Sequence, residues 1–240
     1  MPLNGQTDNA SAPYESGELR AVCGATLRPG GLELTREALG ICAFPPGARL
    51  LDLGCGPGGT LKLLTEMGFE PLGLDRSPTL LAEAARFASV VEADFHHLPL
   101  DDGSQDGILA ECVLSLAGDR AQVLAECARV LKPGGRLALS DVYLKTQPES
   151  PSESRGCLSG AVALEEMSAG LRAAGFEILE TRDHSQALTE LAAQLIWRHG
   201  SAQILSSLWG GCSGPGGGKY GYALLVAARN PSNSISCFSI

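Results

Sequence analysis

The fold is decided by the stretch Leu51-Asp52-Leu53-Gly54-Cys55-Gly56-Pro57-Gly58. A short apolar run begins at Arg49, ends at Leu53, and predicts a buried strand. The glycines at 54, 56 and 58 let the backbone turn sharply and approach a ligand closely. A helix that follows such a turn presents unpaired N–H groups, which favour an anionic group at its start. The stretch therefore predicts a strand, a ligand-binding turn and a helix.

Strands and helices alternate on both sides of this turn. Apolar runs, most of which end on acidic residues, predict further strands over 70–75, 89–94, 106–111 and 136–144. Helix start signals, including Ser77-Pro78 and the pair Asp119 and Gln122, predict helices over about 31–44, 60–67, 78 onward and 120–131. This alternation predicts an α/β fold with a doubly wound, Rossmann-like sheet of about seven strands, mostly parallel with an antiparallel last strand.

The last third of the chain changes in character. A polar linker over 147–156 precedes a helix near 164–174, a strand over 176–181, a largely helical stretch over 186–209, a glycine loop over 210–218 and a strand over 220–228. We divide the chain into an N-terminal segment (1–28), expected to be flexible or a lid, one domain (29–229) and a C-terminal tail (230–240). Within the domain, residues 48–144 are expected to bind a cofactor and residues 145–229 to face an acceptor.

Composition excludes several classes of function. The 240 residues are 44% hydrophobic and 19% charged, with a net charge of −9 and no long basic run, which argues against a nucleic-acid partner. No signal peptide or apolar span is visible, so we expect a cytoplasmic protein that does not associate with membranes. The eight cysteines contain no C-x-x-C pair, and we therefore expect neither a disulfide framework nor a bound metal. A small-molecule substrate is favoured.

Acidic residues at three strand ends indicate the ligand. Asp52, inside the turn, suits a ligand that carries an amino group, and Asp75 can accept hydrogen bonds from both hydroxyls of a ribose. Asp94 is placed to meet an adenine amine while Phe95 covers the ring, and we include Arg76 beside Asp75 in the predicted site. An amino acid, a ribose and an adenine occur together in S-adenosylmethionine. The sequence therefore predicts this cofactor.

Five segments make the sequence resemble the class I S-adenosylmethionine-dependent methyltransferases: 50–58, 73–75, 92–94, 106–116 and 129–135. The resemblance implies that the turn from Gly54 through Cys55 and Gly56 to Gly58 wraps the methionine end of the cofactor. It also implies that Asp75 binds the ribose, that Asp94 and Phe95 flank the adenine, and that Glu111 and Cys112 lie under the sulfonium. A methyltransferase acting on a small molecule is the expected function.

Two further stretches, 111–116 through 139–143 and 156–161, resemble arsenite S-adenosylmethyltransferases. The resemblance implies that Cys157 holds trivalent arsenic, and Cys212 in the glycine loop is a candidate partner. Soft thiolates select soft centres, and a position at a helix start lowers the pKa of a thiol. We therefore take Cys157 and Cys212 as candidate catalytic residues, and arsenite or another soft thiophilic centre as the candidate acceptor. Tyr14, in the N-terminal segment, is a further candidate acceptor contact.

Other interpretations remain open at this stage. A non-catalytic protein that binds S-adenosylmethionine or S-adenosylhomocysteine, and regulates or scaffolds a partner, would share the same cofactor residues. A nicotinamide oxidoreductase is less favoured, because Asp52 stands where a dinucleotide fold usually has an apolar residue. Asp94 could simply cap the end of its strand, and Cys55 and Cys112 could be small packing residues. The sequence does not predict an oligomeric state.

Overall fold

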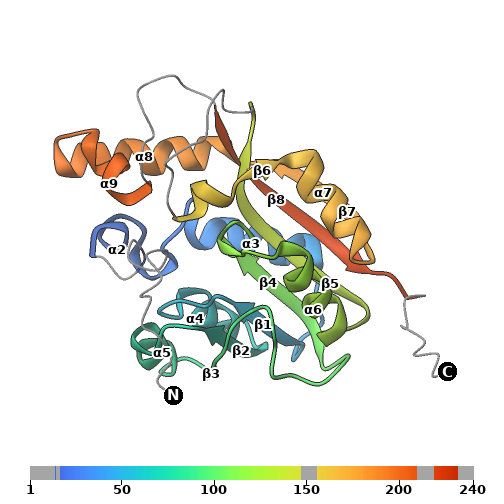
Figure 1. Cartoon of the computed structure of the whole chain (residues 1–240). Helices are drawn as coiled ribbons and strands as arrows, with labels where there is room; N and C mark the ends of the chain where they lie inside the picture. The colour runs from blue at the N-terminus through green and yellow to red at the C-terminus, as the bar shows by residue number, and fades with distance from the viewer. Residues whose placement is uncertain (1–13, 15–16, 147–155, 210–218, 232–240) are drawn as a thin grey trace, which may run out of the picture.

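A single twisted sheet runs through the computed structural model, which describes residues 14, 17–146, 156–209 and 219–231 (Figure 1). Its strand order is β3-β2-β1-β4-β5-β8-β7, with the short β6 beside β5. The strands are β1 (Arg49–Leu53), β2 (Glu70–Asp75), β3 (Ser89–Glu92), β4 (Gln105–Glu111), β5 (Leu131–Leu144), β6 (Val162–Ala163), β7 (Phe176–Asp183) and β8 (Tyr220–Arg229). β8 is antiparallel to both of its neighbours, and the other pairs are parallel. The predicted fold class, including the antiparallel last strand, is confirmed.

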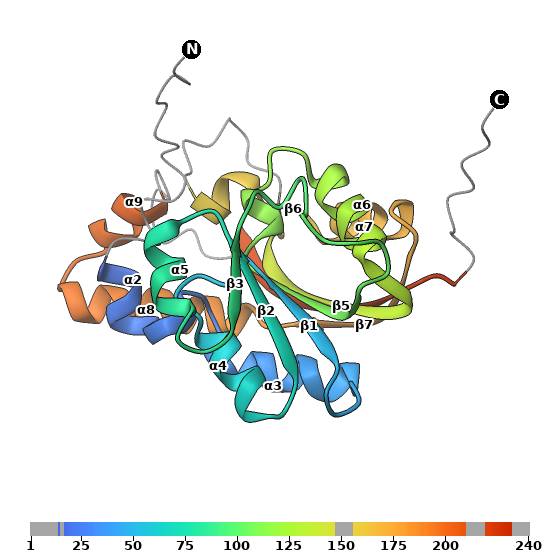
Figure 2. The same ribbon diagram turned by 90° about the horizontal axis from the view of Figure 1, so that it is seen from below.

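Helices cover both faces of the sheet (Figure 2). They are α2 (Gly17–Cys23), α3 (Gly31–Cys42), α4 (Gly59–Glu66), α5 (Pro78–Ala84), α6 (Arg120–Val130), α7 (Leu164–Ala173), α8 (Ser185–His199) and α9 (Gln203–Trp209). Successive side chains of β5 point to opposite faces, as expected for a strand. Leu137 and Leu139 belong to the apolar cluster formed with α6 and α7, whereas Ala138 and Val142 belong to the cluster formed with α2, α3 and α8. The sheet is therefore buried on both sides.

The predicted helix start signals act as expected, with one exception. The Ser77 side chain accepts a hydrogen bond from the Leu80 backbone N–H at 3.3 Å, and Pro78 occupies the first turn of α5. Asp119 caps α6 by accepting from the Gln122 backbone N–H at 3.0 Å. The Gln122 side chain does not complete the predicted capping box, because its amide donates to the His96 carbonyl at 3.2 Å instead. Gln122 thus contacts the loop after β3 instead of the start of its own helix.

Some elements differ from the prediction. Helix α2 and the 3-10 turn η1 (Gly24–Thr26) lie in the N-terminal segment, where no helix was expected. The stretch 186–209 is largely helical as expected, and it is divided into α8 and α9 where Gly200 adopts a left-handed φ of 68°. Cys157 does not lead an α-helix: it lies in the 3-10 turn η3 (Gly156–Gly160), and α7 begins only at Leu164.

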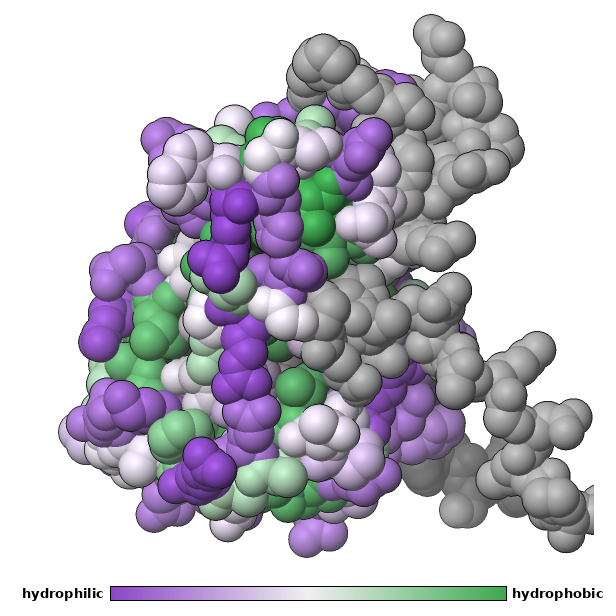
Figure 3. All heavy atoms as spheres, turned by 90° about the vertical axis from the view of Figure 1, so that its left-hand side faces the viewer, coloured by the Kyte–Doolittle hydropathy of each residue, from purple (hydrophilic) through white to green (hydrophobic). Residues whose placement is uncertain are grey.

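No helix in the described part of the chain combines the length and apolar character needed to cross a bilayer. On the face that Figure 3 shows, hydrophilic and hydrophobic side chains are interspersed. Trp197 of α8 is 88% exposed.

Candidate active site

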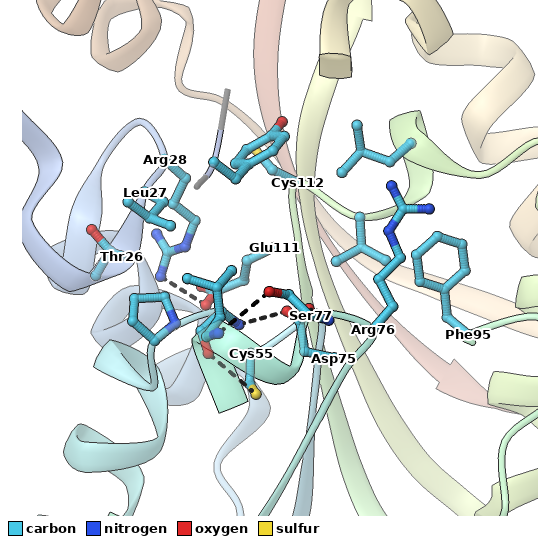
Figure 4. A pocket seen from close by; sticks show the side chains of 17 residues that line it. Thr26, Leu27, Arg28, Cys55, Asp75, Arg76, Ser77, Phe95, Glu111 and Cys112 are labelled. Atoms are coloured by element: carbon cyan, nitrogen blue, oxygen red, sulfur yellow. Dashed lines mark hydrogen bonds and ion pairs between the residues drawn. The ribbon is translucent and has the colours of Figure 1, made fainter. Parts of the chain in front are cut away.

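A pocket opens at the carboxyl ends of β1, β2 and β4, where an open α/β sheet is expected to bind its ligand. It has about 780 Å³ of empty volume, including its open mouth. Its walls come from the N-terminal segment, the glycine turn, the end of β2, the loop after β3 and the end of β4 (Figure 4). The lining residues are Tyr14, Thr26, Leu27, Arg28, Gly54, Cys55, Gly56, Pro57, Asp75, Arg76, Ser77, Leu80, Phe95, Glu111, Cys112, Val113 and Leu116.

Asp75 holds the glycine turn in place. Its Oδ2 accepts a hydrogen bond from the Gly56 backbone N–H at 2.8 Å, and its Oδ1 accepts from the Ser77 backbone N–H at 2.9 Å. Gly54 has a φ of 72°, and a Cβ there would lie 2.6 Å from Val113 Cγ2, so only glycine fits. Gly58 does not line the pocket; it precedes α4 with a φ of 88°, where a Cβ would lie 2.8 Å from the backbone of α5. The turn therefore forms part of the pocket wall with its own backbone.

A buried ion pair joins the N-terminal segment to β4. Arg28 Nη2 lies 2.7 Å from Glu111 Oε2, and the two side chains are only 3% and 8% exposed. Thr35 and Thr60 donate hydrogen bonds to the two Glu111 oxygens at 3.0 and 2.8 Å. These bonds satisfy the carboxylate and hold it at the pocket wall. Sequence reasoning missed Arg28, because a single arginine outside any motif carries no signal.

Asp52 lies behind the turn rather than on the pocket wall. Its side chain is 2% exposed, and among the described residues its Oδ2 has no hydrogen-bond partner. Burial, and then the nearby Glu111 carboxylate, hold the pKa of Asp52 well above its usual value. An unsatisfied buried carboxylate oxygen is costly, and a cationic amino group brought into this region would relieve that cost. The residues present thus fit the amino-acid part of S-adenosylmethionine, and the direct contact of Asp52 stays a prediction.

The predicted adenine residues do not all meet in the pocket. Phe95 and Arg76 line it and stand side by side in Figure 4. The Asp94 side chain is 58% exposed and does not line the pocket; its Oδ1 accepts from the His96 backbone N–H at 2.8 Å and lies 2.5 Å from the His96 ring. Burial is the largest single influence and raises the pKa of Asp94, but the backbone and side-chain bonds from His96 together outweigh it, and the pKa falls below its usual value. This arrangement resembles a strand-end cap, and the adenine contact of Asp94 stays a prediction.

Two cysteines lie close together at the pocket, on the elements that follow β4 and β5. Cys112 lines the pocket, and its Sγ is 3.3 Å from the Tyr222 hydroxyl. Cys157 is buried beside it, and both are free thiols. A hydrogen bond from Cys112 lowers the pKa of the Cys157 thiol, and the same interaction, followed by burial, raises the pKa of Cys112. The cause of the lowered pKa is therefore a neighbouring thiol and not a helix start, and Cys212 lies outside the described residues.

We call the glycine turn with Asp75 and Phe95 the cofactor end of the pocket, and Tyr14, Cys112, Cys157 and Tyr222 the thiol end. The cofactor end contains most of the predicted cofactor residues. The thiol end brings together Cys112, which the sequence predicted under the sulfonium, and Cys157, which it predicted at the acceptor.

Comparison with known proteins identifies the family. A family model described as "Methyltransferase domain" matches residues 51–139, the part that carries the glycine turn. The uncharacterized methyltransferase YodH of Bacillus subtilis (strain 168) is 34% identical over 174 residues, which cover 68% of this chain and 73% of that protein. The chain belongs to the class I S-adenosylmethionine-dependent methyltransferases. S-adenosylmethionine is accordingly the cofactor of this methyltransferase.

Two other similarities bear on the acceptor and the fold. An arsenite methyltransferase of Halobacterium salinarum is 34% identical over 155 residues, which cover 58% of this chain and 39% of that protein. This methyltransferase thus spans well under half the length of that relative. A solved structure described as the [4+2]-cyclase SpnF superposes with a TM-score of 0.74 at 22% identity, covering 96% of this chain and 98% of that one. That likeness shows the fold alone.

Proposed function

We propose that this methyltransferase transfers a methyl group from S-adenosylmethionine to a small thiophilic acceptor, for which trivalent arsenic in the form of arsenite is the candidate. One observation carries the proposal: the glycine turn, Asp75 and Cys112 line a single pocket, and the Cys112 side chain is hydrogen-bonded to Cys157. When bound, S-adenosylmethionine supplies an electrophilic methyl group on a sulfonium sulfur. The residues of the chain then have to hold the two reactants in line and keep water out.

The walls of the pocket suit this positioning role. In this proposal Asp75 accepts hydrogen bonds from the ribose hydroxyls, and its bonds from the Gly56 and Ser77 backbone hold the glycine turn. The apolar side chains of Leu27, Leu80 and Leu116 line the space between these polar groups. Holding two reactants in the right geometry removes much of the entropic part of the barrier, so positioning supplies a large share of the acceleration. A trivalent arsenic centre presents a lone pair, so no general base is needed.

The nature of the acceptor is supported by the thiol end. Thiolates are soft ligands, and they select soft, thiophilic centres over hard oxygen-binding ones. The Cys157 thiol has a pKa below its usual value because of Cys112, which favours the thiolate that such a centre requires. The likeness to an arsenite methyltransferase supports the same class of acceptor.

The test is transfer of a labelled methyl group from S-adenosylmethionine to a panel of small acceptors that includes arsenite, analysed by mass spectrometry. The proposal predicts a labelled methylarsenic product, and Asp75→Ala should reduce its formation at limiting cofactor. S-adenosylhomocysteine binding without methyl transfer to any acceptor would overturn the proposal. It would favour a protein that binds the cofactor without catalysis.

A further inference from the structure

Arg28 places a buried cation on the wall of the pocket. Its side chain is only 3% exposed, yet the residue lines the same pocket as the glycine turn (Figure 4). Its Nη1 donates to the Gly31 carbonyl at 2.7 Å, and its Nη2 donates to Thr35 and pairs with Glu111. Among the residues that the structure describes, none accepts a hydrogen bond from Nε. The guanidinium is therefore fixed in position and keeps a donor for a further acceptor.

The same guanidinium lies at the start of α4. Arg28 Nη2 is 3.4 Å from the Thr60 hydroxyl, in the first turn of this helix. Gly58 occupies the N-cap position and has no side chain with which to cap the helix. The first N–H groups of a helix lack partners within it, and they carry a partial positive charge. A cation and an uncapped helix start thus meet at one place, and together they favour an anion there.

Glu111 balances only part of this positive charge. Arg28, Thr35 and Thr60 supply the hydrogen bonds to its two carboxylate oxygens. The buried pair of Arg28 and Glu111 is electrically neutral as a unit. The start of α4 is therefore left without an anion of its own.

Backbone packing holds Arg28 at this place. A Cβ on Gly59 would lie 2.7 Å from the Ala25 carbonyl oxygen, so the absence of a side chain lets η1 lie against the start of α4. Leu27, which precedes Arg28 and lines the pocket, has a left-handed φ of 53°. Strained backbone of this kind persists where the surrounding structure imposes it, and it clusters at functional sites. The position of the guanidinium is thus set by the fold of the N-terminal segment.

A neighbouring group has the opposite requirement. Asp52 is buried, and no described residue is hydrogen-bonded to its Oδ2 atom. Burial raises the pKa of Asp52 most, the nearby Glu111 raises it further, and the nearby Arg28 opposes both. These three side chains therefore lie together, and they offer a place for an anion beside a place for a cation. The α-amino-acid group of a ligand carries one carboxylate and one ammonium, and it meets both requirements.

We infer that Arg28 is a specificity-determining residue of the cofactor site, which binds the carboxylate at the amino-acid end of S-adenosylmethionine together with the start of α4. The inference concerns the cofactor and does not depend on which acceptor is methylated. A guanidinium suits this role, because its fork of N–H donors matches the geometry of a carboxylate. A ligand that keeps the adenosine and the ammonium but lacks the carboxylate should bind poorly.

The first experiment needs no variant. Calorimetry compares the affinities of the full chain for S-adenosylhomocysteine and for its decarboxylated form, which keeps the ammonium. Hydrogen bonds to charged groups are strong, so we expect the decarboxylated ligand to bind about 100-fold more weakly. Equal affinities would overturn the inference, because the carboxylate would then contribute nothing to binding.

Variants assign this preference to Arg28. In Arg28→Met the preference for the carboxylate should fall below about tenfold, because only the start of α4 remains to bind it. The double variant Arg28→Met/Glu111→Gln removes both members of the buried pair, so no charge is left buried without a partner, and it should show the same fall. Arg28→Lys should restore part of the preference, because lysine keeps the charge but not the fork.

The control separates binding from folding. Arg20→Met changes an exposed arginine of the same segment and should keep the wild-type preference, and unfolding temperatures show that each variant is folded. A structural role of Arg28 would weaken the binding of both ligands equally. An undiminished preference for the carboxylate in folded Arg28→Met, or in the folded double variant, would therefore overturn the inference.

Failure of this inference can be told apart from failure of the proposed function. A carboxylate preference that depends on Arg28, without methyl transfer to any acceptor, would overturn the proposed function and leave the inference standing. Methyl transfer to arsenite by a protein that binds both ligands equally well would overturn the inference and leave the proposed function standing.

Discussion

The two ends of the pocket are built in different ways. At the cofactor end, the bond between Gly56 and Asp75 joins residues only 19 positions apart, at the ends of neighbouring strands. At the thiol end, Cys112 and Tyr222 are 110 positions apart, and Tyr14 and Cys157 come from two further segments. The comparison teaches that a cofactor site can be encoded in a few consecutive strand–helix units, whereas an acceptor site depends on how distant segments pack. Each end should therefore respond separately to mutation.

The largest expected effect comes from the buried ion pair between Arg28 of the N-terminal segment and Glu111 of β4. Arg28→Met leaves the Glu111 carboxylate buried without its partner, which should lower the free energy of unfolding by about 3–5 kcal/mol. The control is Arg20→Met in the same segment, because the Arg20–Glu83 pair is exposed and should cost only about 1 kcal/mol or less. Denaturant unfolding measures the free energy of unfolding of both variants. Equal losses of stability in the two variants would show that the buried pair stabilises the fold no more than the exposed pair does.

The pH dependence of stability should report on Asp141, a buried acid of β5. Asp141 accepts hydrogen bonds from the Ser115 backbone and hydroxyl, yet burial raises its pKa from 3.8 to about 6. The folded protein therefore binds this proton more tightly than the unfolded chain does. Hence this group's contribution to the free energy of unfolding falls as the pH rises from about 4 to 6, by roughly 3 kcal/mol, and is constant above that range.

Asp141→Asn should flatten the stability profile between pH 4 and 6, because the amide does not titrate. Asp101→Asn, in an exposed turn, should leave the profile as it is in the wild type. A profile with the same slope in the Asp141→Asn protein would assign the titration to another group.

A smaller effect is expected on cofactor affinity. Asp75→Ala removes both the predicted ribose acceptor and the group that holds Gly56, so S-adenosylmethionine should bind about 1–3 kcal/mol more weakly. Affinity for phenylarsine oxide, an arsenical that binds pairs of thiols, should not change, which would confirm that the two ends are independent. Calorimetry measures S-adenosylmethionine affinity, with Asp101→Ala as the control. Unaltered cofactor affinity in Asp75→Ala would show that the ribose lies elsewhere.

The smallest effect should come from Tyr14. Tyr14→Phe removes one hydrogen-bond donor and keeps the ring, so affinity for arsenite should fall by about 1 kcal/mol. Tyr143→Phe is the matched control, since its hydroxyl contacts Asp183 and not the pocket. Unchanged arsenite affinity in Tyr14→Phe would remove the hydroxyl from the site and restrict binding to the two thiols.

The sequence allowed much of the fold and of the cofactor end to be predicted, and the reason is physical. Apolar runs, glycines and helix caps act over a few residues, so the parallel strands, Asp75 and Phe95 could be placed from local patterns. Arg28 could not, because its role depends on a partner 83 positions away, Glu111, which no motif links to it. Likewise, nothing in the local sequence shows that Cys112 adopts a left-handed backbone or that its side chain meets Cys157.

The most direct test of a pocket with two functional ends is a crystal structure of the protein with S-adenosylhomocysteine and phenylarsine oxide bound. The account predicts that Asp75 binds the ribose hydroxyls, that Phe95 covers the adenine, and that the homocysteine sulfur faces an arsenic atom held by Cys112 and Cys157. A homocysteine sulfur that points away from the two thiols, or arsenic bound at other cysteines, would contradict it.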